Sequence, residues 1–293
     1  MDQDQPIVSG KRPLWRRIVD YPLVTLVIAT ATYLFALWIG VKVGKFIPPS
    51  GKTADTAIHA AITIAFLLAA YKLIIVRLGA QPKDDLPAGP ALRDGGIGIV
   101  IGFSIMALSV GVAAALGVYR IVGPGDASRL LLELIAVAII PGFTEELLFR
   151  GILFRWIEEF GGSWLALLVT SALFGLAHIL NPNATWFSSF AIAVEAGVLL
   201  GAAYMLTRNL WLAMGLHAGW NFTQGEIFDV PVSGVDEHGL VQAKLSGPEL
   251  LSGGQFGLEG SIIAIIIATG LGIYMIMLAA RRGHLVQPSW MRS

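Results

Sequence analysis

The chain has 293 residues, of which 55% are hydrophobic and 14% are charged, and its mean hydropathy is +0.72. Soluble globular proteins have about 45–50% apolar and about 25% charged residues, and disordered chains are polar and highly charged, so both classes are excluded. The net charge is zero, which gives no basic surface for nucleic acid. Cysteine is absent, which excludes disulfides, thiolate metal sites and cysteine nucleophiles. The composition predicts an all-α integral membrane protein.

Apolar runs predict about eight transmembrane helices, because a bilayer core of about 30 Å needs about 20 apolar residues in a helix. The expected spans are 22–41, 57–76, 95–117, 130–149, 163–180, 188–206, 210–226 and 261–280. The first three and the last are clear apolar runs, whereas the middle four contain ionisable residues and Pro or Gly breaks. The chain is therefore expected to divide into N-terminal helices over 1–127, a catalytic core bundle over 128–226, and a polar loop with a final helix over 227–293.

The distribution of positive charge predicts the topology. A basic cluster precedes the first span, and no cleavable signal peptide is evident. Lys and Arg are also more frequent in the loops on the side of the N-terminus, so both termini are expected in the cytoplasm and the loop at about 227–260 outside. These features fit a bacterial plasma membrane. The cluster consists of Lys11, Arg12, Arg16 and Arg17.

The first group of polar residues in the middle spans follows the helix-breaking pair Pro141-Gly142. A charge at mid-bilayer costs about 2.5–3.5 kcal/mol or more, so such residues are functional candidates. Glu146 and Arg150 are four residues apart and can form an ion pair on one helix face. Glu145 lies about 100° away around the helix and has no partner on it. A salt-bridged helix start in the cytoplasm is the alternative interpretation.

Two further groups lie on later spans. Phe174 and His178 end the span 163–180, and His217 and Asn221 share one face of the span 210–226. A histidine at the membrane interface and an interhelical hydrogen bond are the respective alternatives. Taken together, the three groups place a carboxylate, two imidazoles and an amide where one interior could collect them, and these are groups that hydrolysis uses. Glu195 is an additional acid that could line the cavity or pair with a neighbour.

Two hydrolytic mechanisms are open to these residues. In one, Glu145, His178 and His217 hold a divalent metal such as Zn²⁺, as in His₂Glu zinc sites, with water in the open position. In the other, Glu145 is desolvated and takes a proton from a water that His178 helps to orient. His217 and Asn221 then stabilise the oxyanion.

The motifs E-E-x-x-x-R, F-x-x-x-H and H-x-x-x-N occur in this order over about 128–226. In this the sequence resembles the CPBP family, the CAAX prenyl protease 2-like and bacteriocin-processing intramembrane proteases, also called the Abi or type II CAAX endopeptidase family. The resemblance implies hydrolysis of a membrane peptide or lipidated protein within the bilayer. It implies that Glu145 and His178 activate water and that His217 and Asn221 form the oxyanion site. Glu146 and Arg150 would hold the helix. Members are described as metalloproteases, although a metal-free glutamate mechanism is also argued for.

Other classes fit the sequence less well. Gly123-Pro124-Gly125-Asp126 mimics the G-x-G-D motif of aspartyl intramembrane proteases, but no Tyr-Asp partner occurs in another span. Neither H-E-x-x-H nor G-x-S-G occurs in a span, which disfavours site-2-type zinc proteases and rhomboids. A proton-coupled transporter would show two related halves, and a non-catalytic scaffold or immunity factor would not need costly intramembrane charges.

Overall fold

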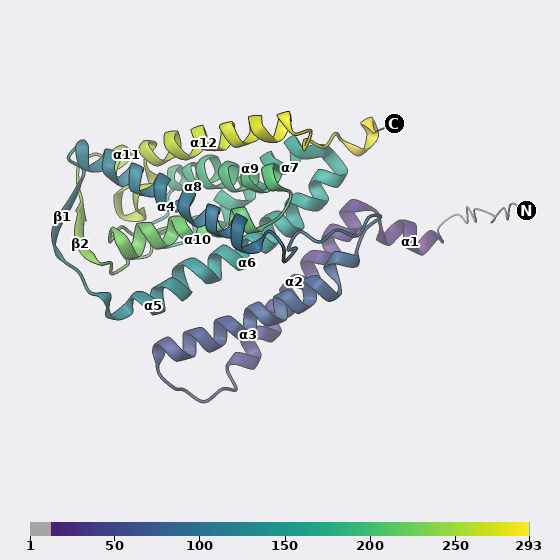
Figure 1. The fold of residues 1–293 in the computed structure, drawn as a ribbon, viewed down its shortest axis with the longest axis horizontal. Coiled ribbons are helices and arrows are strands. Elements are labelled where there is room, and N and C mark those ends of the chain that lie inside the picture. Colours follow the sequence, from purple (N-terminus) through teal and green to yellow (C-terminus); the bar gives the residue numbers. More distant parts are fainter. Residues whose placement is uncertain (1–12, 293) are drawn as a thin grey trace, which may run out of the picture.

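The computed structural model describes residues 13–292 as long helices packed side by side (Figure 1). Lys11 and Arg12 of the basic N-terminal cluster lie outside these residues. The prediction of an all-α membrane protein is confirmed, apart from one small sheet. The count of eight spans is not confirmed, because six described helices are long and apolar enough to cross a membrane. They are Pro22–Gly44, Lys52–Arg77, Ala91–Ala115, Ala127–Leu180, Trp186–Thr207 and Ile262–Arg281.

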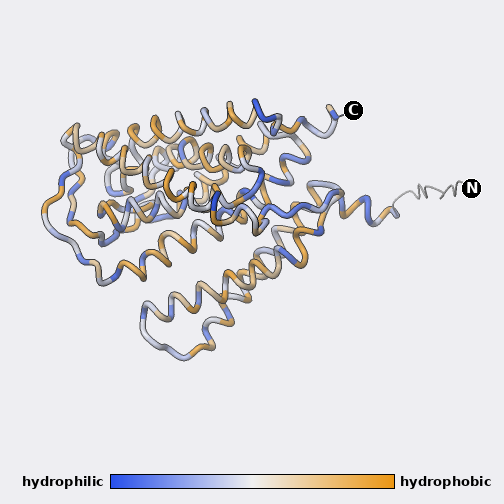
Figure 2. The backbone as a smooth tube through the Cα atoms, viewed as in Figure 1, coloured by the Kyte–Doolittle hydropathy of each residue, from blue (hydrophilic) through white to orange (hydrophobic). Residues whose placement is uncertain are grey.

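The N-terminal and C-terminal helices match their expected spans closely. These are α2 (Pro22–Gly44), α3 (Lys52–Leu73), α4 (Ala91–Ala115) and α12 (Ile262–Arg281). Figure 2 shows hydrophobic residues along most of the length of these helices, as contact with lipid requires. The expected span 188–206 is formed by α8 (Trp186–Ile192) and α9 (Val198–Thr207), joined by a π-helical turn.

Two expected spans, 130–149 and 163–180, lie in one helical run, Ala127–Leu180, which is interrupted at Gly162. This run contains α5 (Leu130–Glu133), α6 (Ile140–Leu148) and α7 (Arg155–Ala177), with π-helical turns between them. The expected end of the span 130–149 is too early, because the helix continues past Arg150. The run kinks at Gly162, whose φ of 80° suits glycine.

The expected span 210–226 is formed by α10 (Trp211–Phe222) and the π-helical turn Thr223–Ile227, which together are shorter than the six candidate spans. α10 packs tightly against α4. A Cβ atom added at Gly102 of α4 would overlap the carbonyl oxygen of Leu216, and one added at Gly219 of α10 would overlap that of Ile99. Small residues at i and i+4 allow such close approach between membrane helices. α10 is thereby fixed in the bundle.

The short helix α1 (Leu14–Val19) and the end of α12 lie at the same end of the molecule (Figure 1). A two-stranded antiparallel sheet lies at the opposite end. It pairs β1 (Tyr119–Pro124) with β2 (Val241–Leu245), and β2 is followed by the short helix α11 (Glu249–Ser252). The polar loop between α10 and α12 therefore gathers at this far end.

Candidate active site

The four predicted catalytic residues line one cavity of about 260 Å³. Glu145 comes from α6, His178 from the 3₁₀ turn that follows α7, and His217 and Asn221 from α10. In a straight helix, a separation of 33 positions along the sequence would place Glu145 and His178 about 50 Å apart. The kink at Gly162 lets the helical run fold back, so the two side chains reach the same cavity.

Glu145 is half-buried, and its Oε2 atom is buried without a hydrogen-bond partner in the described chain. The backbone beside it is held firmly, since the Tyr33 hydroxyl donates to the carbonyl of Thr144 at 3.0 Å. Thr144 in turn donates from Oγ1 to the carbonyl of Ile140 at 2.8 Å. The helix backbone is therefore held in place next to Glu145, and the carboxylate has an oxygen free to bind a water or a substrate group.

Glu146 is fully buried and forms the predicted ion pair with Arg150. Its Oε1 atom accepts a hydrogen bond from Nη1 of Arg150 at 2.8 Å and another from Nδ1 of His217 at 2.9 Å. Nη2 of Arg150 donates to the carbonyl of Gly197 at 3.1 Å. This buried network connects α6, α10 and the π-helical turn Ala193–Gly197, so Glu146 and Arg150 hold the frame of the cavity.

The two imidazoles differ in what their Nε2 atoms can do. Nδ1 of His178 lies 2.7 Å from the carbonyl oxygen of Phe174, which only accepts, so Nδ1 carries the proton. In the neutral ring, Nε2 of His178 is then an acceptor. Nδ1 of His217 donates to the Glu146 carboxylate, so Nε2 of His217 is a donor only when the ring is an imidazolium. Both assignments follow from the partners.

Phe174 supports both histidines. Its ring centroid lies 4.7 Å from that of His178 and 6.1 Å from that of His217, and the Arg150 guanidinium lies 4.7 Å from it. The side chain is 1% exposed. One buried aromatic ring therefore sets the position of the two imidazoles relative to the Glu146–Arg150 pair.

Asn221 donates from Nδ2 to the carbonyl of Val137 at 2.9 Å, which leaves its second N–H bond unused. Val137 lies in the π-helical turn Leu134–Ile139. Such turns change the hydrogen-bond register of a helix, so a backbone carbonyl can accept a hydrogen bond from a side chain. They are also frequent at functional sites. The turn thus joins α10 to the run that carries Glu145.

Several polar residues around the cavity were not predicted from the sequence. Asn181, Ser233 and Glu237 also line it. The backbone N–H and hydroxyl of Ser233 both donate to Oε2 of Glu259, at 2.8 and 3.0 Å. The Asn-Pro-Asn segment after His178 could have indicated Asn181, whereas a single polar residue in a long loop gives no comparable signal. Part of the loop interpreted as a polar surface thus forms a wall of the cavity.

Glu195 does not line this cavity. It lies in the π-helical turn between α8 and α9, is fully buried, and neither of its carboxylate oxygens has a hydrogen-bond partner within residues 13–292.

The donor atoms of Glu145, His178 and His217 suit zinc chemically, as a His₂Glu set. Within the described residues, however, the group whose ligand atoms all lie within 4.8 Å of one another is Glu133, Glu226 and Glu237. Glu145, His178 and His217 do not meet this distance criterion in the described structure.

Residues 127–223 match the family described as type II CAAX prenyl endopeptidase Rce1-like. The matched segment contains all three motifs and every residue of the Glu146 network described above, from Glu145 to Asn221. No curated protein and no solved structure matches the chain significantly. At the level of the family, the match supports an intramembrane protease of CAAX type in a lipid bilayer. Through its segment 127–223, this multi-pass membrane protein is similar to the Rce1-like type II CAAX prenyl endopeptidase family.

Proposed function

We propose that this protein is an intramembrane endopeptidase that hydrolyses a peptide bond in a membrane-associated or lipidated substrate, with Glu145 as the general base. The observation that carries the proposal is the single cavity lined by Glu145, His178, His217 and Asn221, inside the segment that matches the family. Peptide hydrolysis needs a base, a group that orients water, and donors for the oxyanion. These four residues supply all three.

The attack begins at Glu145 and His178. A water donates one hydrogen bond to the unpartnered carboxylate oxygen of Glu145 and another to the acceptor Nε2 of His178. As the water oxygen bonds to the scissile carbonyl carbon, its proton passes to Glu145. When the C–N bond breaks, Glu145 returns that proton to the leaving amine. One carboxylate thus serves as base and then as acid.

The oxyanion that forms on the carbonyl is stabilised by donors from α10. Asn221 offers its unused N–H bond, and His217 offers Nε2–H in its imidazolium form. The Glu146 carboxylate at Nδ1 favours that form, because an adjacent negative charge stabilises the cation. Fixed donors of this kind contribute about 3–4 kcal/mol each to the stability of a transition state.

A divalent metal is not required by these steps. If a metal such as Zn²⁺ is bound by Glu145, His178 and His217, it would supply Lewis-acid polarisation of the carbonyl and a more acidic water. In the bacterial plasma membrane, with both termini in the cytoplasm, the cavity would meet substrates that are anchored in the same bilayer.

The test is proteolysis by purified protein in detergent, using a quenched peptide library that includes a farnesylated CAAX peptide. Glu145→Gln preserves the shape of the side chain but removes the base, so the cleavage rate should fall by about 10²-fold or more. Glu249→Gln is the matched control, because Glu249 is exposed in α11 and distant in sequence from the motifs. Cleavage by the Glu145→Gln variant at the wild-type rate would contradict the assignment of Glu145 as the general base.

A further inference from the structure

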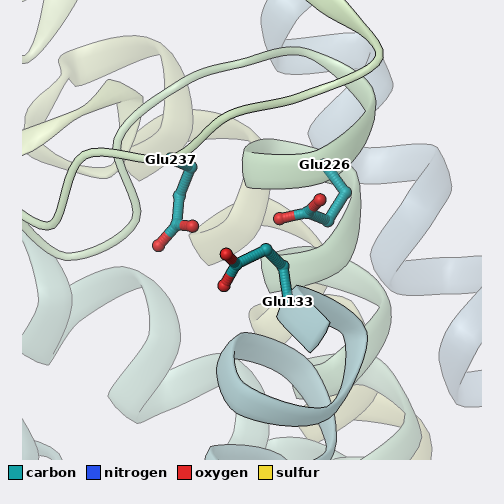
Figure 3. A group of neighbouring side chains, drawn as sticks. All are labelled: Glu133, Glu226 and Glu237. Carbon is teal, nitrogen blue, oxygen red and sulfur yellow. The ribbon is translucent and has the colours of Figure 1, made fainter. Parts of the chain in front are cut away.

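Three glutamates meet beside the active-site cavity, at the end of the bundle that carries the small sheet. Glu133 ends α5, Glu226 lies in the π-helical turn after α10, and Glu237 lies in the loop that follows (Figure 3). One ligand oxygen from each lies within 4.8 Å of the other two. Figure 3 shows the three carboxylates directed towards a common space. Two regions that are distant in the sequence, around 133 and over 226–237, thus present acids to one point.

Glu226 is the member that points most clearly to a ligand. It is 1% exposed, and its Oε1 atom is buried with no hydrogen-bond partner in the part of the chain that is described. Its backbone is held in place, since the N–H of Leu240 donates to its carbonyl at 2.7 Å. A buried carboxylate without a partner is costly, and such groups are normally paired or bound to a metal. The carboxyl group is therefore buried in the cluster with an oxygen that no described group satisfies.

The charges around the cluster do not balance. Arg129 pairs with Glu133 one helical turn away and supplies one positive charge against three carboxylates. Asp229 is also near, but its two oxygens are occupied by the backbone N–H groups of Gly239 and Ala243. When the three carboxylates are ionised, two negative charges lack compensation, which is the charge that one divalent cation supplies.

The donor atoms and their spacing indicate the class of cation. An all-carboxylate set favours hard cations such as Ca²⁺, Mg²⁺ or Mn²⁺ over zinc or copper. Oxygen ligands lie about 2.3–2.6 Å from Ca²⁺, so two ligands of one ion are at most about 5 Å apart, as these are. Mg²⁺ demands a near-ideal octahedron, whereas Ca²⁺ accepts irregular sets completed by water. Glu237 is only half-buried, which leaves a side open to water.

We propose that Glu133, Glu226 and Glu237 bind one Ca²⁺ ion, which fixes the loop 228–240 to the two helical runs that form the cavity. The same loop contributes Ser233 and Glu237 to the cavity wall. Glu133 directly precedes the π-helical turn that receives Asn221, and Glu226 follows α10. The ion is a structural clamp at the rim of the cavity, and it is separate from the four residues proposed for catalysis.

Direct binding tests this proposal on the purified full chain in detergent, without substrate. Calorimetry should show saturable binding of about one Ca²⁺ per chain, and about 1 mM CaCl₂ should raise the Tm above its value in chelator. Glu226→Gln should weaken binding by about tenfold or more and abolish the Tm shift, yet in chelator it should be at least as stable as wild type, since a buried charge is removed. This pattern distinguishes a lost ligand from a misfolded variant.

Asp236→Asn is the matched control, because Asp236 is an exposed acid next to Glu237 in the same loop, and it should keep both responses. Absence of saturable binding to the wild type would overturn the proposal and indicate that the carboxylates share protons instead. A wild-type Tm shift in Glu226→Gln would overturn the site, and a larger shift with MgCl₂ than with CaCl₂ would overturn the choice of ion. These measurements involve no cleavage, so their outcome is independent of the outcome of the protease assay.

Discussion

Nδ1 of His217 donates to Oε1 of Glu146 over 2.9 Å, at a carboxylate that is completely buried. The same oxygen accepts from Arg150, which is also completely buried. A buried pair is weak evidence for stability in itself, but removal of one partner leaves the other charge without compensation. The network therefore has two separable effects, one on the stability of the bundle and one on the protonation of His217.

Glu146→Gln should destabilise the protein by about 3–5 kcal/mol, because Arg150 is then a buried cation without a carboxylate. It should also abolish cleavage, since His217 loses the charge that favours its imidazolium form. The double variant Glu146→Gln/Arg150→Met should recover much of the stability, as measured by Tm in detergent, but no cleavage. Full activity in that double variant would contradict the role given to Glu146.

Phe174→Leu should lower cleavage by about tenfold or more while costing only about 1–2 kcal/mol of stability. The ring contacts both imidazoles and the Arg150 guanidinium, and such aromatic and cation–π contacts contribute about 0.5–2 kcal/mol each. Phe190→Leu is the control, because Phe190 is 60% exposed and should tolerate the change. Equal rates for the two variants would show that Phe174 does not position the histidines.

Gly102→Ala and Gly111→Ala form a matched pair on α4. An alanine normally stabilises a helix interior by about 1 kcal/mol relative to glycine, and a Cβ at Gly111 meets no atom within 4 Å. The Cβ at Gly102 would overlap the backbone of α10 at Leu216 and Trp220. We expect a lower Tm and reduced cleavage for Gly102→Ala only, since α10 carries His217 and Asn221. A Tm for Gly102→Ala equal to that of Gly111→Ala would refute close α4–α10 packing.

The helices that contact lipid could be predicted from the sequence, because continuous apolar runs such as 22–41 leave the backbone no alternative to helix. The similarity to the family that matches residues 127–223 was predicted correctly from the motifs around Glu145, His178 and His217. A charge inside the membrane has a high free-energy cost, so such residues are expected to lie close together in the fold even where the path of the chain is unknown. The structure places them around one cavity, and their chemical roles stay predictions.

The path of the chain in the middle of the bundle could not be predicted. The expected start of a span at residue 163 agrees with the break at Gly162, but the helix that continues from Arg150 to this glycine was expected to be a loop. The π-helical turns could not be predicted either. Each belongs to a longer helical run and changes the hydrogen-bond partners of the backbone, and the sequence pattern carries no signal for that change. The acids at 133, 226 and 237 share no periodicity, and their meeting depends entirely on the tertiary fold.

A chelator should distinguish the two places where a metal could act. If Ca²⁺ clamps the loop 228–240, chelator should lower cleavage by the wild type, because Ser233 and Glu237 form part of the cavity wall, and CaCl₂ should restore it. In Glu226→Gln the chelator should have no further effect, whatever the rate of that variant.

A metal held by Glu145, His178 and His217 would give the opposite result in the same assay. Glu226→Gln would then still lose cleavage on chelation, and ZnCl₂ rather than CaCl₂ would restore it. That outcome would contradict the glutamate-only mechanism. Restoration by CaCl₂ in the wild type, with no chelator effect in Glu226→Gln, would instead place the metal at the rim and leave the chemistry to Glu145 and its water.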